Sequence, residues 1–277
     1  NKLKGLQDSI KNKTTEIYLE KLEYFTEKYS FILKKISNFV GEIDFYKSNA
    51  KTATMFGYHK PEIQDVEDQS FLDAKGLRHP IIERIQTDCE YVPNDICLGL
   101  EKDRLNGMLL YGCNAVGKSS LMKAIGLNII MAQAGLFVAS SEFVFKPFHY
   151  IFTRISDNDN IFKGQSSFAV EMSELRSILK RSNQNSIVLG DELCSGTESV
   201  SAQSIFASSV VRLSMKKVNF VFATHLHELY KLPLVQKLEN VKSFHLKVIF
   251  DDENNKLIYD RKLEPGNGPA IYGLEVC

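Results

Sequence analysis

The sequence predicts an α/β domain with a mixed sheet, preceded by a helical segment, and three observations support this fold class. An apolar run at 107–111 leads through a glycine-rich loop into a helical pattern at 119–134. Two further apolar runs, at 186–190 and 218–224, end in polar residues, which is typical of strands whose carboxyl ends face a ligand in an open α/β sheet. Before residue 60, apolar residues recur at helical spacing instead.

The first segment is predicted to be one long helix. Its apolar residues recur at alternating intervals of four and three, the seam of a coiled-coil-like helix, at Tyr18, Leu22, Phe25, Tyr29, Ile32, Ile36, Phe39 and Ile43. We expect this helix to pack on its neighbours, and the alternative is a lever that transmits motion from a distant site. It should end near Met55, because Gly57 follows and Pro61 forbids an immediate restart.

A polar connector at 61–80 separates this helical segment (1–60) from the α/β domain (61–277). After the connector, 80–85 suggests a strand, and a second apolar run follows at 96–100. The helical segment and the domain are therefore expected to be distinct parts of the chain.

Beyond the glycine-rich loop and its helix, the segments 135–138 and 143–145 are predicted to be strands or core. An acidic, flexible loop is expected at 156–160. A helix follows at 166–180, with Ser166 or Ser167 as its N-cap.

The two apolar runs at 186–190 and 218–224 are predicted to be parallel strands. Near the end of the chain, 244–250 and 256–260 suggest an antiparallel hairpin that turns through 251–255.

The bulk composition is that of an ordinary globular protein. Of 277 residues, 44% are hydrophobic and 25% are charged, with 34 basic against 34 acidic side chains, which argues against tight electrostatic binding of nucleic acid by this piece alone. No apolar run approaches membrane-spanning length, and five scattered cysteines form neither a disulfide framework nor a C-x-x-C site. This use of cysteine favours a reducing, intracellular setting, with nucleus, cytoplasm and organelle left open. Because the chain starts at Asn1 rather than Met, we expect a piece of a longer protein.

The glycine-rich loop fits G-x-x-x-x-G-K-[ST], the P-loop, which binds the phosphates of a nucleoside triphosphate. The predicted phosphate-binding residues are Gly112, Cys113, Asn114, Ala115, Val116, Gly117, Lys118, Ser119 and Ser120. Backbone N–H groups and the helix N-terminus would face the phosphates. Lys118 would bridge the β- and γ-phosphates, and the Ser119 hydroxyl would hold Mg²⁺.

Polar residues follow two of the predicted strands. Asp191 matches the carboxylate of a Walker B strand, which orders Mg²⁺, and Glu192 is placed to polarise the attacking water. His225, after the next strand, would sense the γ-phosphate, although a buried and merely hydrogen-bonded histidine is the alternative. Zinc binding by His225, His227 and Glu228 is disfavoured, because a second cluster of Cys or His ligands is missing from the sequence.

Together these motifs resemble the ATPase domain of the MutS family of DNA mismatch-recognition proteins, a branch of the ABC-type ATPases. The similar segments are 78–83 (R-H-P-I-I-E), 91–94 (Y-V-P-N), 112–120 (G-C-N-A-V-G-K-S-S), 151–155 (I-F-T-R-I), 164–172 (G-Q-S-S-F-A-V-E-M), 191–197 (D-E-L-C-S-G-T) and 222–229 (F-A-T-H-L-H-E-L). Cys113 stands where the family has Pro, and Cys194 with Glu198 is closer to the organellar and viral branches than to the bacterial form.

The resemblance implies a P-loop, ABC-type ATPase domain behind a helical lever. ATP and Mg²⁺ would be its cofactors, and Tyr91 would stack on adenine. Asn114, retained from the family motif, joins Lys118, Glu192 and His225 as a catalytic candidate. Ser166, in the signature segment, would complete the nucleotide site of the partner subunit.

The implied partners are a second subunit, identical or a paralogue, and mismatched duplex DNA. The DNA would be contacted mainly through other parts of a longer protein, and no membrane is involved. Two rival functions are an ABC-type ATPase of transport or of another DNA-maintenance system, and a nucleotide-binding scaffold without hydrolysis. The segment at 166–168 in place of L-S-G-G-Q disfavours the first. The intact set of Lys118, Asp191, Glu192 and His225 disfavours the second.

Overall fold

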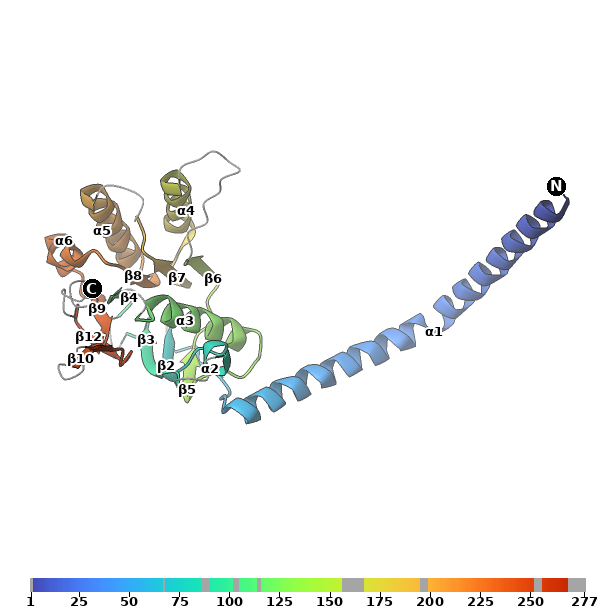
Figure 1. The fold of residues 1–277 in the computed structure, drawn as a ribbon, viewed down its shortest axis with the longest axis horizontal. Coiled ribbons are helices and arrows are strands. Elements are labelled where there is room, and N and C mark those ends of the chain that lie inside the picture. Colours follow the sequence, from blue (N-terminus) through green and yellow to red (C-terminus); the bar gives the residue numbers. More distant parts are fainter. Residues whose placement is uncertain are drawn as a thin grey trace. The chain divides into compact units, whose positions relative to one another are not determined.

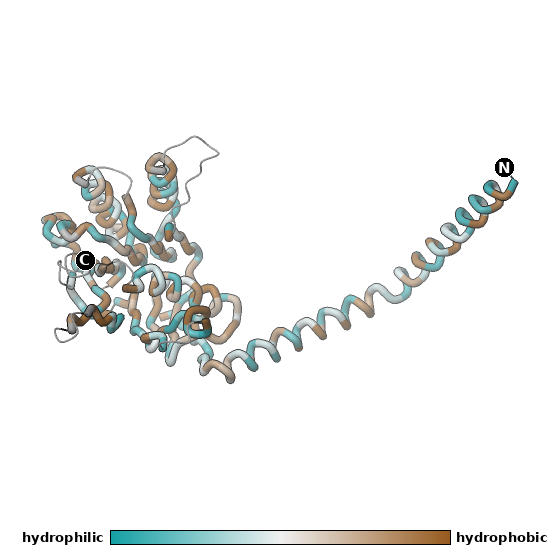
Figure 2. The backbone as a smooth tube through the Cα atoms, in the orientation of Figure 1, coloured by the Kyte–Doolittle hydropathy of each residue, from teal (hydrophilic) through white to brown (hydrophobic). Residues whose placement is uncertain are grey.

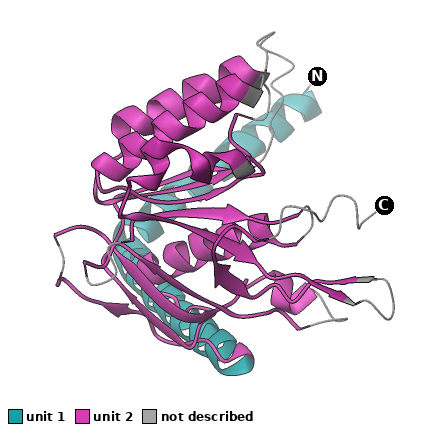
Figure 3. Ribbon diagram, turned by 90° about the vertical axis from the view of Figure 1, so that its left-hand side faces the viewer, with its two compact units in different colours: residues 1–55 teal, residues 56–277 magenta. Residues whose placement is uncertain are grey.

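The computed structural model describes residues 2–66, 68–85, 90–101, 105–113, 116–155, 167–194, 199–251 and 256–268. The chain divides into two compact units, residues 1–55 and residues 56–277 (Figure 3). The first unit is helical and the second is a mixed α/β domain (Figure 1). The fold class expected from the sequence, an α/β domain after a helical segment, is therefore confirmed at this level.

Helix α1 (Lys2–Phe56) runs through the first unit and ends one residue past the predicted Met55. Gly57 follows with φ 61°, a left-handed conformation that glycine adopts without steric cost. Hydrophobic and hydrophilic residues alternate along the helix (Figure 2), and the seam residues are exposed, from 37% at Tyr29 to 63% at Tyr18. The expected packing of this seam on neighbours stays a prediction.

The central element of the second unit is a six-stranded mixed sheet. Its strands, in order across the sheet, are β12 (Leu263–Pro265), β9 (Val241–Leu246), β4 (Gly107–Tyr111), β8 (Asn219–Ala223), β7 (Ser186–Asp191) and β6 (Tyr150–Arg154). All neighbouring pairs are parallel except β12 with β9. The predicted parallel arrangement of β7 and β8 is confirmed, and the carboxyl ends of β4, β7 and β8 lie at one edge.

Helices cover both faces of this sheet (Figure 1). Helix α3 (Lys118–Gln133) packs on one face, whereas α4 (Ser167–Arg181) and α5 (Ser199–Met215) pack on the other. Alternate residues of each strand join opposite cores: Leu110 and Val221 belong to the α3 side, and Leu109 and Phe220 to the side of α4 and α5. The nearly continuous apolar runs in the sequence reflect this burial on both faces.

The segment 61–80, which the sequence analysis describes as a polar connector, contains two strands of a second sheet. This four-stranded sheet has the order β1 (Glu62–Ile63), β5 (Glu142–Phe145), β2 (Leu72–Leu77) and β3 (Asn94–Leu98). Its pairings are between residues distant in sequence, such as Leu72 with Phe145. Short strands that depend on such long-range pairing leave a weak periodic signal.

The strand suggested at 80–85 is also wrong, because this segment contains the short helix α2 (Ile82–Ile85). His79 starts the turn: its Nδ1 accepts hydrogen bonds from the backbone N–H groups of Ile81 and Ile82, both at 3.2 Å. Arg78 Nε then donates to Glu83 Oε2 at 2.7 Å. A side-chain acceptor for the first free N–H groups favours a helical turn over an extended strand.

The predicted hairpin near the end of the chain is confirmed only in its inner part. Strands β10 (Ile249–Asp251) and β11 (Lys256–Ile258) pair in antiparallel fashion, but the residues from Phe244 to Leu246 belong to β9 of the central sheet. A 3-10 helix (His227–Lys231) and α6 (Pro233–Gln236) follow β8. The segment 135–138 contributes only a bridge from Val138 to His59, and the loop expected at 156–160 lies outside the described residues.

Candidate nucleotide-binding site

The glycine-rich loop after β4 has a positive φ at both of its glycines. Gly112 has φ 145° and Gly117, the N-cap of α3, has φ 113°, conformations that side-chain-bearing residues rarely adopt. Val116 is fully buried beneath the loop. Asn114 and Ala115 lie outside the described residues, so the structure does not test their predicted roles.

Lys118 is 5% exposed and lies inside this loop. Its Nζ donates to the backbone oxygens of Gly112 at 2.8 Å and Cys113 at 3.0 Å. Burial lowers the pKa of Lys118 below its ordinary value, while the carboxylates of Glu192 and Asp191 act in the opposite direction. The amine is thus buried inside the loop, where two backbone carbonyl oxygens accept its hydrogen bonds.

Ser119 and Asp191 meet across the site. The Ser119 hydroxyl, at the start of α3, donates to Asp191 Oδ2 at the end of β7. Among the described residues, no group of three or more His, Cys, Asp or Glu side chains is placed to hold a metal ion. One hydroxyl and one carboxylate suit Mg²⁺, which takes few protein ligands and fills its shell with water and phosphate oxygens.

Glu192 and His225 form the next pair. His225 Nε2 lies 2.8 Å from Glu192 Oε1 and 3.3 Å from Lys118 Nζ. A neutral imidazole can donate from Nε2 to the carboxylate or accept there from the ammonium, but not both at once. The tautomer of His225 therefore selects which neighbour it bonds.

Glu192 lies on an unusual turn. Its φ is 48° and that of Cys194 is 68°, and both are non-glycine residues in the left-handed region. The N–H of Glu192 donates to Ala223 O at 3.0 Å, and the N–H of Cys194 donates to Glu171 Oε1 at 2.6 Å. Glu171 was singled out by no sequence argument except its place in the motif at 164–172.

A cavity of about 150 Å³ adjoins the loop. It is lined by Ile82, Tyr91, Val92, Asn94, Val116, Gly117, Ser120, Leu121, Leu246 and Arg261. Burial, and to a lesser degree Glu83, raises the pKa of Tyr91 to about 12, so the phenol stays neutral. The structure thus brings the predicted Tyr91 beside Gly117 and Ser120, and adds Leu246 and Arg261, for which the sequence carried no signal.

Distant hydrogen bonds hold the wall of this cavity. Asn94 Nδ2 donates to Arg261 O at 3.1 Å, and the N–H of Leu263 donates to Asn94 Oδ1 at 2.7 Å. The side chain of Asn94 therefore joins β3 to the start of β12 and to Arg261 just before it. Asn94 and, from later in the chain, Leu246 and Arg261 therefore line the cavity beside Tyr91.

Ser166 and the zinc-ligand candidates beside His225 are the remaining positions that the sequence singled out. Ser166 lies outside the described residues, and α4 begins at Ser167. Glu228 pairs with Lys231 at 2.9 Å instead of joining His225 in a metal site. Within the described ranges, no helix is both long and apolar enough to cross a membrane.

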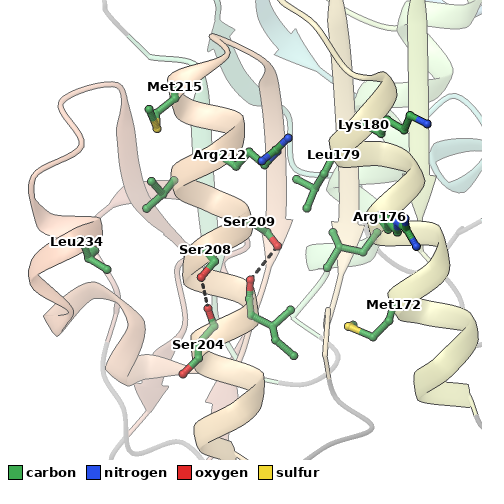
Figure 4. A pocket seen from close by; sticks show the side chains of 13 residues that line it. Met172, Arg176, Leu179, Lys180, Ser204, Ser208, Ser209, Arg212, Met215 and Leu234 are labelled. Carbon is green, nitrogen blue, oxygen red and sulfur yellow. Dashed lines mark hydrogen bonds between the residues drawn. The ribbon is translucent and has the colours of Figure 1, made fainter.

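A larger cavity, of about 890 Å³, lies between α4, α5 and α6 (Figure 4). Met172, Leu179, Met215 and Leu234 contribute apolar side chains to its lining, and Arg212 is among its basic lining residues. The lining includes no carboxylate and no glycine-rich loop. Size alone therefore does not mark the chemical site, and the smaller cavity beside Tyr91 is the better candidate.

Comparison with known proteins gives a consistent result. A family model described as MutS domain V matches residues 108–277. The chain is 39% identical to a protein named as a DNA mismatch repair protein mutS homolog of Acanthamoeba polyphaga mimivirus, over 100% of this chain and 28% of that protein. It is also 39% identical to the mitochondrial DNA mismatch repair protein mutS homolog of Sarcophyton glaucum, over 99% of this chain and 27% of the relative.

A bacterial relative is more distant. The DNA mismatch repair protein MutS of Finegoldia magna is 33% identical over 99% of this chain and 32% of its own length. The chain thus spans less than a third of these curated relatives. The higher identities to the viral and the mitochondrial relative agree with the resemblance suggested by Cys194 and Glu198.

Proposed function

The chain belongs to the MutS family, and from this premise we propose that its second unit is a P-loop, ABC-type ATPase domain that hydrolyses ATP with Mg²⁺. One observation carries the proposal. Lys118, the Ser119–Asp191 pair and the Glu192–His225 pair converge from the ends of three neighbouring strands. Loop amides, a lysine, a hydroxyl–carboxylate pair and a second carboxylate are the groups that phosphoryl transfer requires.

The binding role falls to the loop and Lys118. On binding, Lys118 would exchange the carbonyl oxygens of Gly112 and Cys113 for phosphate oxygens, which restores a full countercharge to its buried ammonium. Ser119 and Asp191 would hold Mg²⁺, which when bound neutralises charge on the β- and γ-phosphates. The ring of Tyr91 would stack on adenine in the adjoining cavity.

The hydrolytic step would use Glu192 and His225. Water attacks the γ-phosphorus, the bond to the bridging oxygen breaks, and ADP and phosphate form. Glu192 would accept a proton from this water, while His225 Nε2, 2.8 Å from Glu192 Oε1, orients the carboxylate. Because His225 also lies 3.3 Å from Lys118 Nζ, it is suited to sense the γ-phosphate that Lys118 holds.

The purpose of hydrolysis would be conformational, as part of DNA mismatch repair. For the proposal that α1 is a lever, the supporting contacts lie within the second unit: Arg78 Nη2 donates to the backbone oxygens of Phe56, the last residue of α1, and of Gly57, the residue after it. Arg78 also pairs with Glu83 of α2, and Ile82 of the same helix lines the cavity beside Tyr91. A change in that cavity would thereby reach the end of α1.

Partners belong to the same proposal. We infer a dimer, of identical chains or with a paralogue, in which Ser166 of each chain completes the other nucleotide site. Mismatched DNA would be bound mainly by parts of a longer protein, since the relatives extend well beyond the matched region. An ABC-type ATPase of another DNA-maintenance or transport system is the alternative, and family membership disfavours it.

The test is an ATPase assay with and without mismatched duplex DNA. We expect slow, Mg²⁺-dependent release of phosphate from the 277-residue chain, and stimulation by mismatched DNA only in a longer protein that includes the DNA-binding parts. Tight ATP binding without any turnover, in both the 277-residue chain and the longer protein, would favour a non-hydrolysing scaffold. Turnover that mismatched and matched DNA leave equally unchanged in the longer protein would favour the alternative ATPase.

A further inference from the structure

The turn after β7 holds its catalytic candidate in a conformation that needs support. Glu192 and Cys194 both have positive φ values, 48° and 68°. Non-glycine residues persist in this region only where the surroundings fix them, and such strain is common at functional sites. Whatever holds this turn therefore also sets the direction of the Glu192 side chain.

Two hydrogen bonds hold the turn, one at each end. The N–H of Glu192 is bound to Ala223 O of β8, which keeps the turn beside the strand that leads to His225. The N–H of Cys194 is bound to Glu171 Oε1 of α4 at 2.6 Å. Leu193, between these two bonds, is buried in the core that α4 and α5 form on one face of the sheet.

Packing alone does not explain a glutamate at position 171 of α4. The residue is 6% exposed, and burying a carboxylate is unfavourable unless the charge is compensated. It projects from α4 to a backbone N–H of another element 23 residues away in sequence. Bonds from a backbone N–H to a carboxylate are stronger than those to neutral acceptors, so Glu171 is well suited to fix the turn.

We propose that Glu171 is a positioning residue for ATP hydrolysis: through the Cys194 N–H it fixes the turn that holds Glu192 beside His225. This inference rests on the proposed ATPase function. In the described contacts, Glu171 touches neither Glu192 nor His225. It acts through its hydrogen bond to the backbone N–H of Cys194. Loss of its carboxylate would let Cys194 leave the left-handed conformation, and Glu192 would lose its distance of 2.8 Å from His225.

The chain offers a matched control. Glu174 lies three positions further along the same helix, but it is half exposed and pairs with Arg154 at 3.2 Å. Its replacement removes a carboxylate from α4 without touching the turn. Glu171→Met removes the acceptor at nearly constant volume, whereas Glu171→Gln keeps a side-chain oxygen that can accept from the Cys194 N–H.

The experiment measures turnover, ATP affinity and melting temperature for the chain with Glu171→Met, Glu171→Gln or Glu174→Met. We expect Glu171→Met to lower kcat about 10- to 100-fold, because small misplacement of a catalytic group has effects of this size. Nucleotide affinity should stay within about twofold, since the phosphate loop is unchanged. Glu171→Gln should keep most of kcat, and Glu174→Met all of it.

A second comparison separates positioning from general damage. In a Glu192→Gln background, Glu171→Met should reduce the residual rate little further, because the group it positions is already absent. An equal fall in both backgrounds, an unchanged kcat in Glu171→Met, or a loss of kcat in Glu171→Gln as large as in Glu171→Met would overturn the proposal.

Hydrogen exchange at the Cys194 amide provides a readout that does not depend on hydrolysis. We expect protection of this amide in the unaltered chain, in Glu171→Gln and in Glu174→Met, and its loss in Glu171→Met. If the unaltered chain hydrolyses no ATP although the amide behaves in this way, the proposed function fails while the support of the turn by Glu171 stands. Protection that persists in Glu171→Met contradicts the support itself.

Discussion

Lys118 Nζ lies 3.3 Å from His225 Nε2, although 107 positions separate the two residues in the chain. Lys118 begins the helix after β4, and His225 follows β8. Because β4 and β8 are parallel neighbours, their carboxyl ends bring the phosphate-loop cation and the histidine together. This relationship underlies the predictions below.

Lys118→Ala should weaken binding of ATP strongly, because the phosphate loop loses its buried cation. Binding of a fluorescent ATP analogue, titrated with and without Mg²⁺, measures the change. Lys123→Ala is the control, since Lys123 lies on the exposed side of the same helix. Equal affinities of the two variants would show that Lys118 does not contact the phosphates.

Tyr91→Ala should reduce ATP affinity by about 1–3 kcal/mol, the range for loss of an aromatic stacking partner. Tyr91→Phe should cost little, because the ring face and not the hydroxyl makes the proposed contact. Isothermal titration gives the affinities, and a thermal melt without nucleotide gives the stability. If Tyr91→Ala lowers only the melting temperature and leaves relative affinity unchanged, Tyr91 is a core residue and not a base platform.

The cysteine thiols near the site should be slow to alkylate at neutral pH. Burial raises the pKa of Cys194 to about 11, with a smaller contribution from Glu171, and burial also raises the pKa of Cys113. Since the thiolate is the reactive form, labelling by iodoacetamide should rise only as pH increases toward these raised pKa values. Mass spectrometry of peptides labelled between pH 7 and 10 tests this, and rapid labelling of Cys194 at pH 8 would contradict it.

Nucleotide should protect Cys113 in the same assay, because Cys113 belongs to the phosphate loop and is partly exposed. ATP with Mg²⁺ should therefore slow its labelling. Cys97, on β3 of the second sheet, is also partly exposed and provides the internal control.

The assembly prediction concerns Ser166. If Ser166 completes the partner's nucleotide site, homodimers of Lys118→Ala or of Ser166→Ala should both be nearly inactive. A mixed dimer of the two variants should regain activity, because one of its sites has both Lys118 and Ser166. The test belongs on a full-length protein in which subunit exchange has been verified. Absence of recovery would place Ser166 in its own chain's site, or outside catalysis.

The strands around the phosphate loop could be predicted from the sequence because their signals are local. Strand β7 is an apolar run that ends in Asp191, β8 is followed within two residues by His225, and β4 leads through the glycine-rich loop to Lys118. A parallel arrangement of these strands was therefore enough to bring the three side chains together. The end of α1 and the start of α3 could also be predicted from local residues, since Gly57 follows the first helix and Gly117 precedes the second.

Other features depend on contacts that no local pattern shows. Helix α5 escaped prediction because it is rich in serine, a residue that competes with the helical backbone for hydrogen bonds. In the fold, hydroxyls such as that of Ser208 bond back to the preceding turn. The cavity beside Tyr91 is lined in part by Leu246 and Arg261, which lie more than 150 positions later in the chain. The proposed role of Glu171 depends on its hydrogen bond from the N–H of Cys194.

The most direct test of the central claim, that this site hydrolyses ATP by water activation at Glu192, is a comparison of binding and turnover in Glu192→Gln. The variant keeps the shape of the side chain and removes its basicity. The account predicts ATP affinity within about twofold of the unaltered chain and turnover lower by roughly 10²–10⁴-fold, the size of a general-base contribution. Unchanged turnover, or a loss of affinity as large as that caused by Lys118→Ala, would contradict it.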